Sequence, residues 1–82
     1  MKRMLMAEQW DKFARAVMPA NVPTVQRREM RRAFYAGGEA ILFRVMAMMG
    51  QGDEPTAEDL QIMTDLYEEL RDFSVHMLQG RA

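Results

Sequence analysis

The chain has 82 residues, no cysteine, one histidine and a formal net charge of −1. Disulfides are therefore excluded, a metal centre is not expected with a single histidine and no tight carboxylate cluster, and no cofactor is expected. A domain this small buries little surface, and its apolar fraction of 49% is high, so we expect a homo-oligomer.

Membrane and nucleic-acid partners are not expected. No apolar run approaches the length that spans a bilayer, and the N-terminal ten residues lack the long apolar core of a signal peptide. A charge near zero gives no support for nonspecific binding to nucleic acid. The absence of cysteine fits a reducing compartment, so we expect a cytoplasmic protein.

The first expected helix covers about residues 6–18. Four large apolar residues recur at spacings of four, three and four, which is one helix face: Met6, Trp10, Phe13 and Val17. We expect Trp10 and Phe13 to make its main core contact. The helix should stop before Pro19 and Pro23, which exclude helix continuation.

A second and longer helix is expected over residues 24–49, with Thr24 as its N-cap. Its C-terminal half is apolar nearly all round, which indicates burial on more than one side. The sequence GQGDEP then marks its end.

The third expected helix covers residues 56–79. The sequence TAED forms a capping-box variant between Thr56 and Asp59, and Gly80 suits the C-terminal end. Between them runs a coiled-coil-like apolar stripe: Met63, Leu66, Leu70, Phe73 and Met77, widened by Leu60 and Tyr67. No strand pattern or repeat is present, so we predict one all-α domain over residues 1–82, a long antiparallel helical hairpin with a short N-terminal helix packed on it.

Charge is unevenly distributed over this hairpin. Arginines cluster at the start of the second helix, at Arg27, Arg28, Arg31 and Arg32, and acids dominate residues 53–72. With a turn near residues 50–55, level positions of the two helices have numbers that sum to about 105. The cluster then lies past most of the acids, and Glu29 can pair with two arginines at best. Three interpretations stay open: a solvated basic face, a phosphate site, or a contact with an acidic partner protein.

The cluster is followed by an aromatic pair, Phe34 and Tyr35, and by a glycine pair, Gly37 and Gly38. Adjacent aromatics point to different faces, so one is expected in the core and the other at an interface or a ligand. Each helical glycine costs about 1 kcal/mol relative to alanine. Close helix packing is the favoured compensation, and close approach of the backbone to a ligand is the alternative. No nucleophile with an orienting partner accompanies His76, so we do not expect an enzyme.

The stretch RREMRRAFYAGGEAILFRVM resembles small helical proteins of bacteriophages and prophages. From about residue 26 to 49 it is similar to the helical hairpin of phage cyclic-nucleotide sponges, most plainly at Phe34, at Gly37 or Gly38, and at Arg44. Those proteins counter the CBASS and Thoeris defence systems. The resemblance implies an oligomer that sequesters a host cyclic-nucleotide signal between subunits without cleaving it.

From these observations we predict a non-enzymatic counter-defence protein that binds a cyclic nucleotide at an oligomer interface. Residue chemistry assigns phosphate binding to Arg27, Arg28, Arg31 and Arg32, and stacking to Tyr35. The resemblance adds Arg44 as a phosphate-binding candidate, and Phe34, Gly37 and Gly38 as candidates for stacking or backbone contacts. The alternative is a protein-binding inhibitor or adaptor that meets a host defence protein through its charged helix faces, as anti-CRISPR proteins do. A DNA-binding regulator is less favoured than either of these, and an enzyme is the least favoured class.

Overall fold

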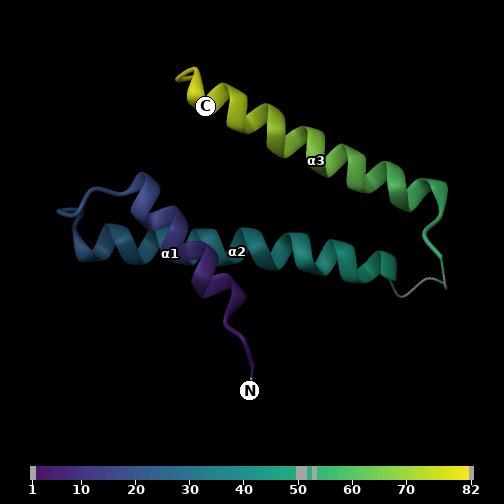
Figure 1. Cartoon of the computed structure of the whole chain (residues 1–82), viewed down its shortest axis with the longest axis horizontal. Coiled ribbons are helices and arrows are strands. Elements are labelled where there is room, and N and C mark those ends of the chain that lie inside the picture. Colours follow the sequence, from purple (N-terminus) through teal and green to yellow (C-terminus); the bar gives the residue numbers. More distant parts are fainter. Residues whose placement is uncertain (1, 50–51, 53, 82) are drawn as a thin grey trace. The chain divides into compact units, whose positions relative to one another are not determined.

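The computed structural model describes residues 2–49, 52 and 54–81 and contains three helices. They are α1 (Leu5–Val17), α2 (Thr24–Met49) and α3 (Ala57–Leu78) (Figure 1). The described residues include no strand, which confirms the all-α class. Each helix boundary lies within one residue of its predicted position.

The chain divides into two compact units, Met1–Val45 and Met46–Ala82. The first unit holds α1 and most of α2, and the second holds the last turn of α2 together with α3. The antiparallel hairpin and the homo-oligomer stay predictions.

The core of the first unit forms where α1 crosses the N-terminal half of α2 (Figure 1). Trp10 is only 5% exposed, and its ring centroid lies 5.5 Å from that of Phe34 in an edge-on arrangement. Phe13 completes the aromatic cluster, with its centroid 5.3 Å from that of Phe34. Trp10 and Phe13 are thus confirmed as the core contact of the first helix, and Phe34 is the member of the aromatic pair that faces them.

The two glycines of the pair have different surroundings in the structure. A Cβ atom on Gly38 would lie 2.5 Å from Cε and 3.1 Å from Sδ of Met6, so the end of the Met6 side chain of α1 packs directly on α2 at this point. A Cβ atom on Gly37 would meet nothing within 4 Å. Close packing within the chain therefore accounts for Gly38 and leaves Gly37 without an explanation in the first unit.

Gly37→Ala is expected to stabilise the isolated chain by about 1 kcal/mol, because alanine removes the helix cost of glycine and its Cβ enters open space. Gly38→Ala should increase the stability of the chain by less, since the flexible end of the Met6 side chain must first move aside. Urea denaturation followed by circular dichroism measures both changes. A destabilising Gly37→Ala would show that another helix packs on Gly37 in solution.

The N-terminus of α2 differs from the prediction by one position. The backbone N–H of Arg27 donates to the carbonyl oxygen of Pro23 at 3.0 Å, so Pro23 occupies the N-cap and Thr24 is already the first helical residue. Proline is tolerated here because the backbone N–H groups at a helix start have no intrahelical acceptor. The prediction of Thr24 as the N-cap is wrong for this reason.

Both ends of α3 are capped as predicted. Thr56 Oγ1 accepts from the N–H of Asp59 at 3.0 Å, and Asp59 Oδ2 accepts from the N–H of Thr56 at 3.0 Å, which is a complete capping box. At the other end Gly80 has a φ of +73°, and the N–H groups of Gly80 and Arg81 donate to carbonyls of the last turn. This pattern is a Schellman motif, and it requires the left-handed conformation that glycine adopts freely.

Candidate anion-binding site

One face of α2 carries the side chains that make the candidate site. Arg28, Arg31, Arg32 and Tyr35 follow one another at steps of three, one and three residues, which places all four on the same helix face. They line an open recess of about 400 Å³ on the first unit. The three arginines are exposed and Tyr35 is half-buried. The recess therefore presents several guanidinium groups to a molecule arriving from solvent.

Arg31 is held by the aromatic ring beside it. Its guanidinium carbon lies 5.2 Å from the ring centroid of Tyr35, four residues further along the helix. Stacking of this kind is attractive and leaves the edges of the guanidinium free to donate hydrogen bonds. A ligand ring that stacks on the same face of Tyr35 must displace Arg31, so the structure gives Tyr35 a different neighbour from the predicted one.

The other arginines of the cluster differ in what holds them. Arg32 Nη1 donates to Glu29 Oε1 at 2.9 Å, a pair that is exposed at both ends and stabilises by less than about 1 kcal/mol. Arg27 lies outside the recess, with its guanidinium carbon 5.9 Å from the ring centroid of Trp10. Among the described residues, Arg28 makes neither an ion pair nor a cation–π contact. Arg28 is therefore available to an anion without losing a partner in the described structure.

The remaining predicted site residues are not brought to the recess. Phe34 packs against Trp10 and Phe13, and neither Gly37 nor Gly38 lines the recess. Arg44 is exposed and follows Arg32 by 12 residues, or about 18 Å along the helix axis. The structure therefore gathers Arg28, Arg31, Arg32 and Tyr35 and leaves the other five candidates elsewhere.

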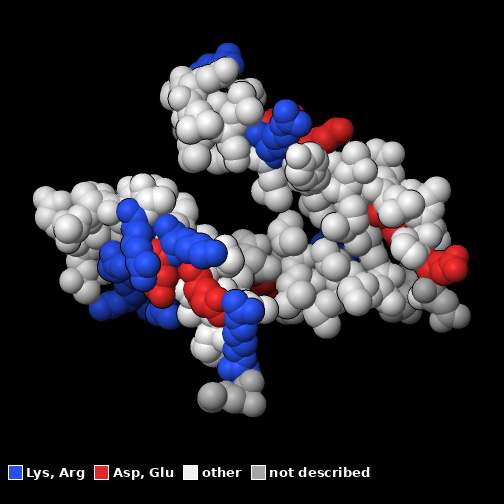
Figure 2. Space-filling model, viewed as in Figure 1, with Lys and Arg blue, Asp and Glu red and all other residues white. Residues whose placement is uncertain are grey.

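The two units carry opposite charge. The first contains nine lysines and arginines against four acids, and the second contains two arginines against eight acids. Figure 2 shows a cluster of basic side chains over α1 and the first half of α2. The first unit by itself therefore contributes a positive electrostatic potential at the recess, even though the whole chain has a charge of −1.

Two ion pairs occur in the described part of the chain, and both lie in the first unit. Arg3 donates twice to Glu8 of α1, at 2.8 Å from Nε and at 2.7 Å from Nη2. These bonds lower the pKa of Glu8 below its usual range. Their small stabilisation is present near neutral pH and is lost as pH falls through that lowered pKa. Glu8 is thus engaged away from the arginine cluster.

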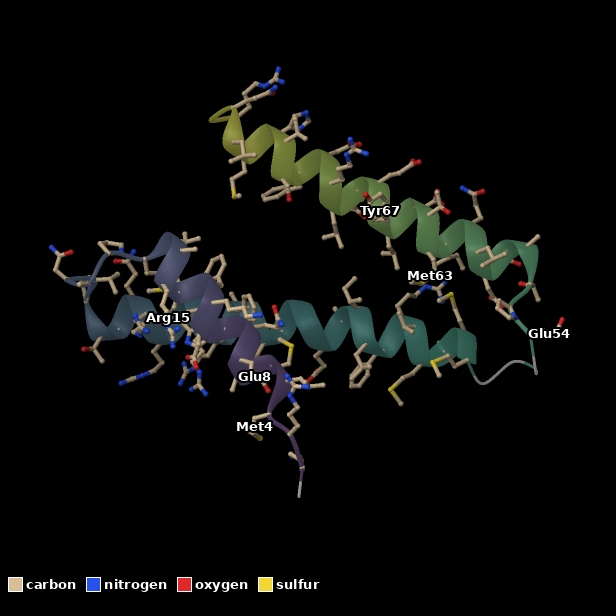
Figure 3. All side chains as sticks on the ribbon, in the orientation of Figure 1. Met4, Glu8, Arg15, Glu54, Met63 and Tyr67 are labelled. Atoms are coloured by element: carbon tan, nitrogen blue, oxygen red, sulfur yellow. The ribbon has the colours of Figure 1, made fainter. Side chains whose placement is uncertain are left out.

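The second unit presents a different surface. The apolar stripe of α3 is exposed to solvent except at Leu66, which is half-buried, and Figure 3 labels two of its exposed members, Met63 and Tyr67. The exposed members of the stripe are Leu60, Met63, Tyr67, Leu70, Phe73 and Met77. The acids Asp65, Glu68, Glu69 and Asp72 fall outside the stripe in the helical repeat. An exposed amphipathic helix face of this kind is typical of a protein-binding surface.

Sequence reasoning identified the recess residues but missed two contacts around them. The pairing of Arg31 with Tyr35 is readable from the i, i+4 spacing, because such residues are neighbours on a helix. The stacking of Arg27 on Trp10 is not readable, since it depends on where α1 crosses α2.

Within the described residues no group of three or more histidines, aspartates or glutamates is arranged to hold a metal ion. No described helix is both long and apolar enough to cross a membrane. Comparison with protein-family models, with curated proteins and with solved structures finds no match to this chain.

Proposed function

We propose that this protein binds a phosphorylated small molecule of the cyclic-nucleotide class and does not transform it. The observation that carries the proposal is the recess on α2, where Arg28, Arg31 and Arg32 present three guanidinium groups together. Planar guanidinium groups form paired hydrogen bonds with phosphate oxygens, and such charge-assisted bonds are the strongest of their kind. The excess positive charge of the first unit adds long-range attraction for an anion.

The side chains lining the recess favour binding over chemistry. Three are permanently charged arginines and the fourth is a tyrosine whose ring lies against Arg31. Neither a carboxylate nor an imidazole lines the recess to act as a general base. A protein that binds its ligand without cleaving it lowers the free concentration of that ligand, which is how the cyclic-nucleotide sponges act.

The biological role we propose is phage counter-defence in the cytoplasm of a bacterial host. It rests on the resemblance of residues 26–49 to cyclic-nucleotide sponges. In this proposal α2 and α3 form an antiparallel hairpin, and several copies assemble through exposed apolar surface. The exposed stripe of α3 and the exposed Leu42, Phe43, Met46 and Met49 of α2 supply surface for both contacts.

Native mass spectrometry of the purified protein tests the proposal. The protein is measured alone and with a panel of cyclic dinucleotides, cyclic trinucleotides and cyclic isomers of ADP-ribose. We expect an oligomer that retains at least one of these ligands with unchanged ligand mass. A protein that remains unliganded across the panel contradicts the proposed ligand class, and a ligand recovered in cleaved form contradicts the absence of chemistry.

A second candidate function is supported by α3. Its exposed apolar stripe, with acidic residues outside the stripe, suits a partner protein that has an apolar groove with a basic rim. In this case the protein acts as an inhibitor or adaptor of a host defence complex. The same mass spectra distinguish the two functions. If the protein is an inhibitor or adaptor, we expect a monomer without affinity for any nucleotide in the panel.

A further inference from the structure

The four aromatic rings near the crossing of α1 and α2 all have partners within the protein, whereas Phe43, farther along α2, is exposed. Phe13 and Phe34 pack with Trp10 in the core. The guanidinium of Arg27 lies over the ring of Trp10, and that of Arg31 lies over the ring of Tyr35. Tyr35 also meets Phe34 edge-on, with 6.4 Å between the ring centroids, and packs against the core cluster. Tyr35 is the aromatic residue among the described residues that line the recess, and Arg31 already lies over its ring, so a nucleobase that stacks on that face must first displace Arg31.

The lining of the recess also lacks groups that distinguish one base from another. Arg28, Arg31 and Arg32 provide hydrogen-bond donors and no acceptors. Among the described lining residues, the hydroxyl of Tyr35 is the sole side-chain acceptor. Reading the edge of adenine, guanine or a pyrimidine requires donors and acceptors in a specific order. Three arginines instead match what every nucleotide shares, which is the phosphate.

From these contacts we infer that the recess recognises the phosphates of its ligand and not the base, with Tyr35 acting as a positioning residue that holds Arg31 toward the phosphate. The inference rests on the proposed function and narrows the class of ligand that the recess would bind. The ligand class becomes compounds with two or more phosphates brought close together, whatever base they carry. Tyr35 contributes through the ring that supports Arg31 and not through contact with the ligand.

Isothermal titration calorimetry on the full chain tests the inference with four probes. Three are cyclic dinucleotides that differ only in base, namely cyclic di-AMP, cyclic di-GMP and cyclic di-UMP. The fourth is trimetaphosphate, a cyclic polyphosphate without any base. We expect the three dinucleotides to bind within about fivefold of one another and trimetaphosphate to compete with them for the same site.

Substitutions at Tyr35 separate a positioning role from ligand stacking and from a general structural role. Tyr35→Phe keeps the ring beneath Arg31 and is expected to bind all probes as the unchanged protein does. Tyr35→Leu removes the ring and should weaken trimetaphosphate and the dinucleotides by the same factor, about tenfold, with unchanged helix content. A loss restricted to the dinucleotides would show that Tyr35 contacts the base and would overturn the inference.

The outcomes distinguish this inference from the proposed function. Binding of one dinucleotide at least 20-fold more tightly than the others contradicts phosphate recognition and leaves the proposed function standing. Binding of trimetaphosphate together with base-independent binding of dinucleotides supports both. Failure of all four probes to bind contradicts the proposed function, and the inference falls with it.

Discussion

Arg31→Glu is expected to weaken binding of a cyclic nucleotide by at least about 100-fold while leaving the helix content unchanged. The change removes a charge-assisted hydrogen bond worth about 1.5–3 kcal/mol and places a negative charge against the phosphate. Arg31 is exposed, and its guanidinium contacts the face of Tyr35, so folding does not depend on its charge. Isothermal titration calorimetry gives the affinity and circular dichroism gives the helix content.

Arg44→Glu is the matched control for this prediction. It makes the same change of charge on the same helix, at an exposed position that does not line the recess. We expect a loss of less than about fivefold, because a charge farther away than the screening length of roughly 8 Å acts weakly on the ligand. Equal losses for Arg31→Glu and Arg44→Glu would mean that the overall charge of α2, and not the recess, attracts the ligand.

Trp10→Ala is expected to destabilise the first unit by about 3–5 kcal/mol, the usual cost of truncating a buried large aromatic residue. Trp10 is the most buried large side chain of the cluster and contacts Phe13 and Phe34, so its loss leaves a cavity between α1 and α2. A small domain has little stability to spare, so α1 should detach or the unit should unfold. Urea denaturation followed by circular dichroism at 222 nm measures the change, because the variant has no tryptophan fluorescence.

The control for Trp10→Ala is Val17→Ala on the same helix. Val17 is exposed, and alanine is the better helix former, so its replacement should change stability by less than about 0.5 kcal/mol. A loss of under 1 kcal/mol in Trp10→Ala would contradict the placement of α1 on α2. Trp10→Ala also removes the ring over which Arg27 lies. The binding of anions by Arg28 and Arg31 should weaken in Trp10→Ala only if α1 detaches from α2.

Local features of the fold were predictable because each depends on residues close in sequence. The spacing of Met6, Trp10, Phe13 and Val17 predicted α1, although the structure leaves Val17 exposed. Thr56 with Asp59 predicted the start of α3. The error at Thr24 is also local, since Pro23 and Thr24 compete for the same cap position. Periodicity and capping thus carry enough information for helix number, helix bounds and helix ends.

The placement of the predicted site residues was only partly predictable, because tertiary contacts decide where some of them lie. The common face of Arg28, Arg31, Arg32 and Tyr35 follows from helix geometry alone. The assignment of Gly38 to a contact with Met6 requires the crossing point of α1 on α2, which the sequence does not encode in any short pattern. Arg44 was grouped with the cluster by resemblance, and the length of α2 places it well away from the recess.

The opposite charges of the two units have a practical consequence for handling the protein. The sequence pI of about 5.8 averages a basic half and an acidic half. At neutral pH the first half carries a net positive charge and the second a net negative charge. At pH 7 and low salt the chain should adsorb to cation-exchange and to anion-exchange resins alike, through different halves. Its solubility should rise with moderate salt, since screening weakens attraction between the basic half of one molecule and the acidic half of the next.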